Sequence, residues 1–484
     1  KFGGMVDVSS INDYNRAILA GRRRGQVGRD HDHGNYLAPR ESRHVVGDVT
    51  QTLTDQLRFR RWPDVISMAL SNNDIKGQTD SDWMRMGMIP PQVEIEIPYR
   101  TLLPGGLEDI LVTGKAVSVT HDALPSIRMQ PDFENLGGAA GLAAAQAIRE
   151  GTTVRGIDLP ALQRRLVEVG LLPETVLTRR LAPRSYSDAD LEALVRQLAE
   201  DDRPFHAFSN QELDEVYRER LPLVEVCCAG PRAVPILQDA LAEAKGPARI
   251  RLAQALCAMG DRSGVPVLVE ELNSHLAATR LPRRVAFIQQ VDEWAPDQSA
   301  MPEAAYLLYS LGMARDRRAL PIWQRAVDLL AAARLEDVWS QAKGVFYYVD
   351  AVCYGAENLG DPEAVPMLKQ LHGYEPFHGQ ELTEGFQASY FLERAAYLEV
   401  VIGRTLARCG SAEGLEVLTR YLNDTRGILA RHAYAELCAI TGEDCGRDAE
   451  AWHAWIEMHG QHLQPRPRLG PTEAMQAWDE EALE

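Results

Sequence analysis

The feature that most constrains the fold of this chain is a pattern of helix ends that recurs through its second half. From about residue 187, an apolar helical stretch is repeatedly followed by Gly or Gly-Asp, a short turn and a second helix, often opened by Val-Pro or Leu-Pro. Proline suits the first turn of a helix, where its missing N–H costs no hydrogen bond. Repetition of this kind is typical of stacked helix pairs, because one pair cannot bury its apolar face alone. The glycines of the five instances are Gly230, Gly260, Gly312, Gly360 and Gly410, at spacings of 30, 52, 48 and 50 residues.

These helix pairs resemble HEAT repeats, and the resemblance covers about residues 187–458. We therefore expect an all-α, HEAT-like solenoid there, with an N-cap in Ser187–Asp190 before its first helix. The unequal spacings predict inserted loops or lengthened helices. Residues 461–484 are rich in proline and then acidic, which predicts an extended tail.

Charge and cysteine content narrow the possible functions. The net charge of −18 is uneven, since residues 1–175 carry −2 and the remainder carries −16. Binding a phosphate backbone requires clustered Lys and Arg, so we expect no nucleic-acid partner. The apolar runs are short and interrupted by charges, so we expect no membrane span. The seven cysteines start at Cys227 and include no CxxC pair, which argues against a disulfide framework and a cysteine-ligated cluster.

Residues 1–175 mix strands, loops and helices. The alternation of apolar and charged residues in Val93–Ile97 predicts a half-exposed strand. The apolar run Ile110–Thr113 predicts a strand buried on both faces and ending at Gly114. A Gly/Ala-rich segment then predicts a helix that starts at residues 137–141 and stops at Gly151.

Two further helices are expected in this region, one from Tyr14 to Gly25 and an amphipathic one from Leu159 to Val169. The basic run Arg22–Arg24 is interpreted as the solvated end of the first of these helices.

Gly114 and the predicted helix start at 137–141 together suggest a cofactor site. A glycine after a buried strand lets the backbone approach a ligand such as the ribityl chain of a flavin closely. A helix N-terminus presents free N–H groups and the positive end of its dipole, which stabilise the negative charge of a reduced flavin. Small residues at 137–141 let that backbone come near the ring. Close packing alone is the alternative explanation for these small residues.

A family resemblance makes the flavin interpretation more specific. IPYRTLLPGGLEDILVTGKAVSVTHDALPSIRMQP, followed by LGGAAGLAAA, is similar nearly position by position to the end of a family of bacterial FAD-dependent oxidoreductases. That family is related to the flavin-binding component of heterodisulfide reductase. The upstream PRESRHVVGDVTQTLTDQLRFRRWPDVIS also resembles it, so the resemblance covers roughly residues 30–173. It implies that residues 1–175 are the C-terminal portion of an FAD-dependent oxidoreductase domain, an α/β fold ahead of the solenoid.

The resemblance also implies roles for individual residues. His121 would be catalytic, as a proton donor or acceptor beside the substrate; the alternative is a loop histidine that bonds only to backbone. Thr120 and Ser126 would line the loop near the ring. The implied cofactor contacts are Gly114, Lys115, Ser118, Gly137, Gly138, Ala139 and Ala140. The implied substrate-binding residues are Arg40, Arg100 and Arg128, for which structural salt bridges are the alternative.

Two departures from the family pattern stand out. Lys115 follows the turn glycine, where many flavoproteins carry an acidic residue that binds ribityl hydroxyls. The amino-terminal GxGxxG that would hold the ADP pyrophosphate is absent. Either an upstream segment or another chain supplies that half, or the region does not bind the cofactor. The Asp30–His33 run invites a metal interpretation, but without a further ligand we expect a solvated loop and no metal site.

The sequence therefore predicts an FAD-dependent oxidoreductase that transfers hydride between an unidentified organic substrate and flavin N5, with a helical-repeat accessory domain. The alternative is a non-catalytic HEAT-repeat scaffold that carries a truncated flavoprotein domain. The expected partners are a small-molecule substrate and a protein bound through the solenoid or through a missing N-terminal segment. The compartment stays open, with a cytoplasmic location slightly favoured.

Overall fold

The computed structural model describes residues 7, 10–24, 41, 43–71, 73, 79–88, 92–182, 184–200, 217–282, 301–332, 345–385, 390–468 and 470–481. The chain divides into two compact units, which we describe separately. We call them the sheet unit, Pro39–Ala255 with Pro471–Glu484, and the helical unit, Lys1–Ala38 with Leu256–Gly470. The division falls within α10 (Gly246–Ala258). Among the described residues, no helix combines the length and apolar character that crossing a membrane requires.

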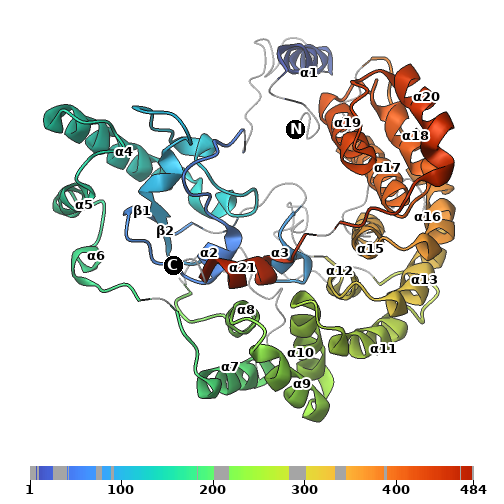
Figure 1. Ribbon diagram of the computed structural model, residues 1–484, viewed down its shortest axis with the longest axis horizontal. Coiled ribbons are helices and arrows are strands. Elements are labelled where there is room, and N and C mark those ends of the chain that lie inside the picture. The colour runs from blue at the N-terminus through green and yellow to red at the C-terminus, as the bar shows by residue number, and fades with distance from the viewer. Residues whose placement is uncertain are drawn as a thin grey trace. The chain divides into compact units, whose positions relative to one another are not determined.

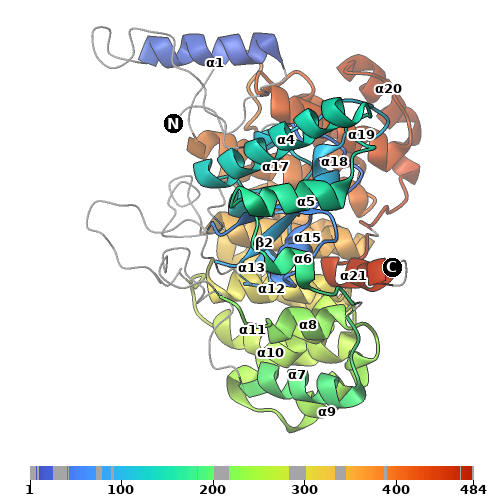
Figure 2. The ribbon, with the colours of Figure 1, turned by 90° about the vertical axis from the view of Figure 1, so that its left-hand side faces the viewer.

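The sheet unit is built around a small antiparallel sheet of two strands in the described residues, β1 (Val65–Ala69) and β2 (Ile95–Pro98). β2 confirms the strand predicted over 93–97, but all four of its residues are buried rather than half-exposed. Helix α4 (Gln130–Glu150) packs on β1 (Figure 1), and α5 (Leu159–Glu168) lies beside α4 in both views (Figures 1 and 2). Gln163 of α5 donates to the carbonyl of Val65, which ties the helix to the sheet.

The predicted strand over Ile110–Thr113 is wrong. These residues form an irregular segment, and Ile110 is 43% exposed. One hydrogen bond, from the Val112 N–H to the Leu102 carbonyl, ties the segment to the rest of the unit. A short apolar run is an ambiguous signal, because it becomes a strand only where a neighbouring strand can pair with it.

The predicted start of α4 is also wrong. The helix begins at Gln130, about two turns before residues 137–141, with Pro131 in its first turn. Asp132 caps this end, because its carboxylate accepts the Met129 N–H at 3.1 Å. The C-terminal boundary was predicted correctly, since Gly151 ends the helix at a φ of 65°.

Of the other helices of the sheet unit, α7 confirms its predicted start, whereas α21 contradicts the predicted tail. Ser187 and Asp190 form the predicted cap of α7, with each side chain bonded to the other residue's backbone N–H. The tail was expected to be extended, but it contains α21, whose Trp478 indole N–H donates to the Cys227 carbonyl at 2.6 Å. These helices are α2 (Leu53–Leu57), α3 (Asp82–Arg85), α6 (Thr175–Thr178), α7 (Asp188–Glu200), α8 (Pro222–Cys228), α9 (Ala233–Glu243) and α21 (Glu473–Glu481).

The helical unit consists of helix pairs joined by short turns. Neighbouring helices pack in the order α12, α15, α17, α18, with α19 against both α17 and α18. Large side chains such as Trp323, Tyr348, Tyr421 and Trp452 are fully buried in this unit. Its helices are α1 (Ile11–Arg24), α11 (Val265–His275), α12 (Glu303–Met313), α13 (Leu320–Leu330), α15 (Val345–Leu359), α16 (Val365–His372), α17 (Tyr390–Arg408), α18 (Ala412–Tyr421), α19 (Gly427–Thr441) and α20 (Ala449–His459).

Helix α1 confirms the helix predicted over residues 14–25 and groups with the helical unit. Arg16 of α1 bonds to both Asp13 and the Thr425 carbonyl, and Asp7 pairs with Arg431 at 3.1 Å. The sequence instead predicts that this helix belongs to the FAD-dependent oxidoreductase region, residues 1–175.

The recurring glycines take two different roles. Gly230, Gly260, Gly360 and Gly410 adopt positive φ values of 87°, 74°, 62° and 90° and end their helices. A left-handed residue of this kind closes the last turn of a helix, and glycine adopts the conformation without strain.

Gly312 differs, because it lies inside α12 and faces Gly355 of α15. A Cβ on Gly312 would lie 2.7 Å from the Gly355 Cα, so the pair of glycines allows the two helices to cross closely. The left-handed residue after α12 is Arg315, with a φ of 49°.

Candidate functional site

The candidate site lies in the sheet unit, where the chain leaving β1 meets the loop before α4. Ser71 donates to the Asp132 carboxylate at 2.5 Å and so joins the end of β1 to the first turn of α4. The Asn73 side-chain amide donates at 3.0 Å to both the Asp122 carbonyl and the Ser126 hydroxyl. These bonds bring loop 118–128, β1 and α4 together.

Ser118 holds the loop to an earlier segment of the chain. Its buried hydroxyl accepts the Gly47 N–H at 3.0 Å and lies 2.8 Å from the Thr50 hydroxyl. The backbone continues the connection, because the Thr120 N–H donates to the Gln51 carbonyl at 2.9 Å. The hydroxyl of Ser118 therefore supports the loop from within.

His121 forms an ion pair with Glu41, which also bonds to His44. One carboxylate oxygen of Glu41 lies 2.9 Å from His44 Nε2, and the other bonds to His121 Nδ1. The second ring nitrogen of His44 lies 3.0 Å from the Val117 carbonyl. A ring nitrogen facing a carbonyl or a carboxylate must carry a proton to bond, so both contacts of His44 favour its imidazolium form.

The pKa values follow from this arrangement. Burial opposes charge on both partners of the His121–Glu41 pair, but their mutual attraction is stronger. Burial would raise the pKa of Glu41, yet hydrogen bonds from His121 and His44 lower it to about 2. Burial would lower the pKa of His121, yet Glu41, Asp122 and Asp80 raise it to about 9. His121 is therefore protonated at neutral pH.

Asp122 follows His121 and organises the far side of the loop. Its Oδ2 atom accepts the Thr79 hydroxyl at 2.8 Å and the Asp80 N–H at 2.7 Å. Its buried Oδ1 atom has no hydrogen-bond partner among the described residues and lies 3.7 Å from His121 Nε2. Burial raises the pKa of the Asp122 carboxyl. The loop thus holds a buried acceptor beside the imidazolium of His121.

Glu473, the first residue of α21, adds a second carboxyl close to this loop. It accepts the Ser81 hydroxyl at 2.5 Å. Burial, together with the negative charges of Asp82 and Asp122, raises the pKa of Glu473 to about 8. Glu473 therefore retains a proton over much of the neutral range.

The geometry suits a flavin at two places. Gly114 opens a 3-10 turn at a φ of 69°, and no atom lies within 4 Å of the position of an added Cβ, so a ligand can approach this backbone. At the first turn of α4, Pro131 has no N–H and the Phe133 N–H bonds to the Met129 carbonyl. The N–H groups of Gln130 and Asp132 are the donors of that turn which a ligand could use.

Residues 137–141 do not suit the predicted helix-start role, because they lie in the middle of α4. Gly137, Gly138 and Gly141 are exposed, whereas Ala139 and Ala140 are buried. Their N–H groups take part in the helix ladder, so they cannot stabilise a reduced flavin as helix-start donors. Because the exposed glycines carry no side chains, a ligand or another segment of protein can still approach the helix backbone closely there.

The remaining residues that the sequence predicts for the cofactor, substrate or metal have different surroundings in the structure. Lys115 is exposed beside Gly114. Arg100 pairs with Asp64 through two bonds of 3.0 and 3.1 Å, which is the salt-bridge alternative for this residue. Arg128 is half-buried, two residues before α4. Arg40 and the Asp30–His33 run lie outside the described residues.

Sequence reasoning missed Glu41, His44, Asp122 and Glu473. Asp122 could have been noticed because it adjoins His121. The partnership of Glu41 with His121 spans 80 positions, and that of Glu473 with Ser81 spans 392. No local pattern reports contacts at such separations, which only the fold creates.

A comparison with known proteins finds a family match in the same part of the chain. Residues 12–166 match the model of a family described as FAD dependent oxidoreductase. The matched segment begins within α1, ends within α5, and contains every residue of the site above except Glu473. No curated protein matches the chain. Residues 12–166 therefore match the FAD-dependent oxidoreductase family, and FAD is the cofactor that this match implies.

Proposed function

We propose that the chain takes part in hydride transfer between a small organic substrate and FAD, with His121 as the proton donor to the substrate. The observation that carries this proposal is the Glu41–His121 ion pair, on the loop that runs from the Gly114 turn to the first turn of α4. A charged imidazole beside a site where a substrate gains hydride can supply the accompanying proton.

FAD, when bound, supplies the centre that accepts or donates hydride. The backbone at Gly114 would lie along the cofactor, and the Gln130 and Asp132 N–H groups would face its polar edge. Glu41 would hold His121 in its orientation and keep it charged. Arg128 would orient an anionic substrate, because a guanidinium pairs well with carboxylate or phosphate.

Asp132 imposes a condition on this arrangement. A carboxylate at the first turn of α4 would repel the negative charge of a reduced flavin placed there. Burial raises the pKa of Asp132, while bonds from Ser71 and Met129 oppose this effect. We propose that Asp132 takes up a proton when negative charge develops beside it.

The test is the uptake of FAD by the purified chain, followed by flavin absorbance and by quenching of flavin fluorescence. We expect binding that survives gel filtration, and we expect Gln130→Pro, which removes one first-turn N–H, to weaken it. Ala145→Ser, on the same helix but far from its first turn, serves as the matched control. A chain that takes up no FAD at any concentration would contradict the proposal.

The second candidate is a non-catalytic scaffold, in which residues 187–458 form HEAT-like repeats that bind a protein partner and residues 1–175 do not bind FAD. Two observations favour it: the sequence lacks GxGxxG, and the Asp132 carboxylate occupies the first turn of α4. This candidate predicts no flavin uptake, so the same experiment separates the two.

For both candidates we propose that the helix pairs serve as an accessory surface for a protein partner. The support is their repeated helix–turn–helix order, with four of the five turns closed by a left-handed glycine. Stacked pairs of this kind commonly present a continuous face to a partner.

A further inference from the structure

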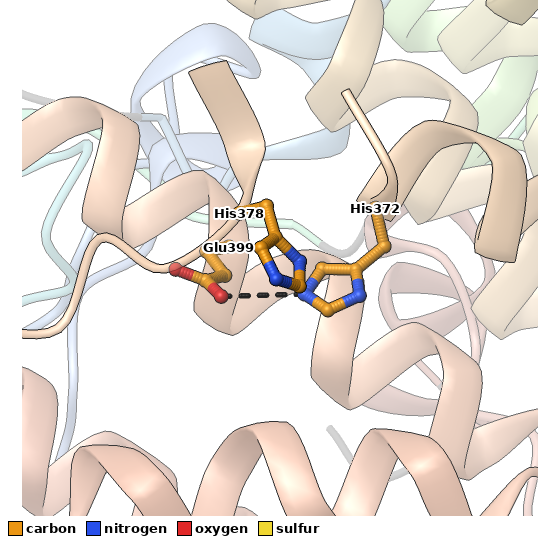
Figure 3. Close-up of side chains that lie close together, drawn as sticks. All are labelled: His372, His378 and Glu399. Carbon is orange, nitrogen blue, oxygen red and sulfur yellow. Dashed lines mark hydrogen bonds and ion pairs between the residues drawn. The ribbon is translucent and has the colours of Figure 1, made fainter. Parts of the chain in front are cut away.

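A second cluster of chemically capable side chains lies in the helical unit, apart from the flavin-type residues. His372 ends α16, His378 directly follows the short turn Glu375–Phe377, and Glu399 lies in α17. One ligand atom from each of the three lies within 4.8 Å of the others (Figure 3). We propose that these residues bind a divalent transition-metal ion, with Zn²⁺ as the best match.

The spacing of the ligand atoms supports this assignment. Zinc bonds to imidazole nitrogen and carboxylate oxygen at about 2.0–2.2 Å, so ligand atoms around one tetrahedral ion lie roughly 3.3 Å apart. His372 Nε2 lies 3.2 Å from Glu399 Oε1. The ring centroids of His372 and His378 are 4.6 Å apart. His378 is exposed, so a change of rotamer can complete the set without repacking a core.

Glu399 is already held in the orientation that a ligand needs. Its two oxygens accept the Gly379 N–H at 2.9 Å, the Gln380 N–H at 2.6 Å and the Tyr421 hydroxyl at 2.8 Å. Hydrogen bonds of this type fix metal-binding carboxylates in proteins. Because Glu399 and His372 are both buried, two of the three ligands are rigidly placed.

A carboxylate also lies near His372, in the direction where metal-binding histidines usually have an outer partner. Its Nδ1 atom lies 3.9 Å from an oxygen of Glu413, and Glu413 pairs with Lys369 at 2.6 Å. A small rotation would let the Nδ1–H donate to Glu413 while Nε2 binds the ion. A carboxylate behind a histidine in this way fixes the tautomer that a metal ligand requires.

Arg420 is the group that competes with a metal ion for Glu399. Its guanidinium lies 3.2 Å from Oε1, the same oxygen that faces His372. A second carboxylate is available to it, because Arg420 Nε lies 3.6 Å from Glu381. We infer that a bound ion displaces Arg420 toward Glu381.

The ligand types decide the class of metal. Two imidazoles and one carboxylate favour zinc, copper, nickel or iron over magnesium or calcium, which prefer oxygen ligands alone. Three protein ligands leave a fourth position for water, and exposed His378 opens it to solvent.

The experiment is a titration of tag-free, metal-stripped full chain with Zn²⁺ alone, followed by calorimetry and by competition with a chromophoric chelator. We expect the unaltered chain to bind one more equivalent of zinc than His378→Ala, or to bind it at least tenfold more tightly. His378→Ala is the primary variant because it alters an exposed side chain. Circular dichroism checks that it folds.

His453→Ala is the matched control, since His453 pairs with a single carboxylate, Glu416, in the same unit. We expect this variant to bind zinc like the unaltered chain. The assignment would be overturned if the unaltered chain and His378→Ala bound zinc equally. It would also be overturned if His453→Ala lost as much zinc binding as His378→Ala.

Arg420→Gln tests the competition directly. Removing the guanidinium should tighten zinc binding severalfold, because Glu399 no longer shares its charge. Binding that is unchanged or weaker would overturn the role of Glu399 as a ligand. A Co²⁺ titration adds a spectroscopic readout, because the visible bands of cobalt report the coordination number of the bound ion.

Discussion

At the scale of the residue, the clearest chemical arrangement in the sheet unit is one carboxylate between two imidazoles. Glu41 bonds to His44 and His121 with its two oxygens. The negative charge of Glu41 stabilises the protonated form of each histidine. A substitution at Glu41 should therefore alter the protonation of both. His121 itself was identified from the sequence, but the carboxylate that sets its pKa was not.

Replacing this carboxylate should change the charge state of His121. In Glu41→Gln the main stabiliser of the imidazolium is lost, and we expect the pKa of His121 to fall from about 9 by at least one pH unit. Imidazole NMR shifts recorded against pH would measure the change. Glu108→Gln, at a largely exposed glutamate, is the control and should leave the pKa of His121 in place.

The same pair gives the stability of the sheet unit a defined pH dependence. Because folding raises the pKa of His121 from 6.5 to about 9, the stabilisation is complete below pH 6.5 and is lost as pH rises toward 9. Folding lowers the pKa of Glu41 from 4.5 to about 2, so that contribution is complete above pH 4.5 and is lost as pH falls. Urea unfolding from pH 2 to 10 should show both losses, and Glu41→Gln should flatten both.

At the scale of the element, helix α4 was predicted from the sequence, but its first residue was predicted wrongly. The Gly/Ala run drew the predicted start to residues 137–141, although Pro131 and Asp132 carry the ordinary first-turn signals. The end at Gly151 was predictable, because a left-handed glycine after an Arg-bearing last turn is a common stop. Short strands were harder to predict, since β2 formed beside a partner strand, whereas the 110–113 run has no partner strand in the part of the chain that the structure describes.

Gly137→Ala tests whether the exposed face of α4 has a ligand-related role. An alanine in mid-helix restricts the unfolded chain and meets no atom within 4 Å, so we expect a gain of about 0.5–1 kcal/mol in the free energy of unfolding. FAD uptake should be unaffected if the cofactor lies at Gly114 and the first turn of α4. A more stable variant that no longer takes up FAD would place the cofactor against Gly137 instead.

Helix α21 is docked through a carboxyl that prefers to stay protonated. Folding raises the pKa of Glu473 from 4.5 to about 8, so its contribution to stability is complete below pH 4.5 and is lost as pH rises to 8. In Glu473→Gln this pH dependence should disappear, and at pH 8 the variant should unfold at higher urea than the unaltered chain. Lower stability of the variant at pH 8 would contradict the protonated state of Glu473.

At the scale of the whole molecule, the chain divides into two compact units. A destabilising mutation in the core of one unit therefore tests whether the two units unfold independently. A Cβ on Gly355 would lie 2.3 Å from the ring of Trp323, which is fully buried. Gly355→Ala should therefore destabilise the helical unit by about 2–3 kcal/mol through overpacking. Hydrogen exchange should show lost protection within residues 256–470 and retained protection in β1 and β2; equal losses in both would mean that the units unfold together.

The sequence predicts a boundary between residues 175 and 187, whereas the two compact units divide at residues 255 and 256, so that α7, α8 and α9 of the predicted solenoid belong to the sheet unit. Some helix ends carry local signals, and the one at Ser187 before α7 was identified correctly. The cluster of His372, His378 and Glu399 gave no such signal, because α16 and α17 bring its members together from positions up to 27 apart. Family resemblance identified FAD as the cofactor, whereas the ion pairs around His121 depend on packing between distant segments.

The turn after α12 has a consequence for any attempt to exchange modules of the helical unit. Arg315 occupies the left-handed position there, and its side chain bonds to the carbonyls of Arg468 and Gly470. A consensus glycine at 315 would relax the backbone but release that late segment, so a gain in local propensity would be offset by lost long-range order. This helix pair therefore has a long-range contact of its own, and recombination that exchanges it for another helix pair of the helical unit should fail first at this position.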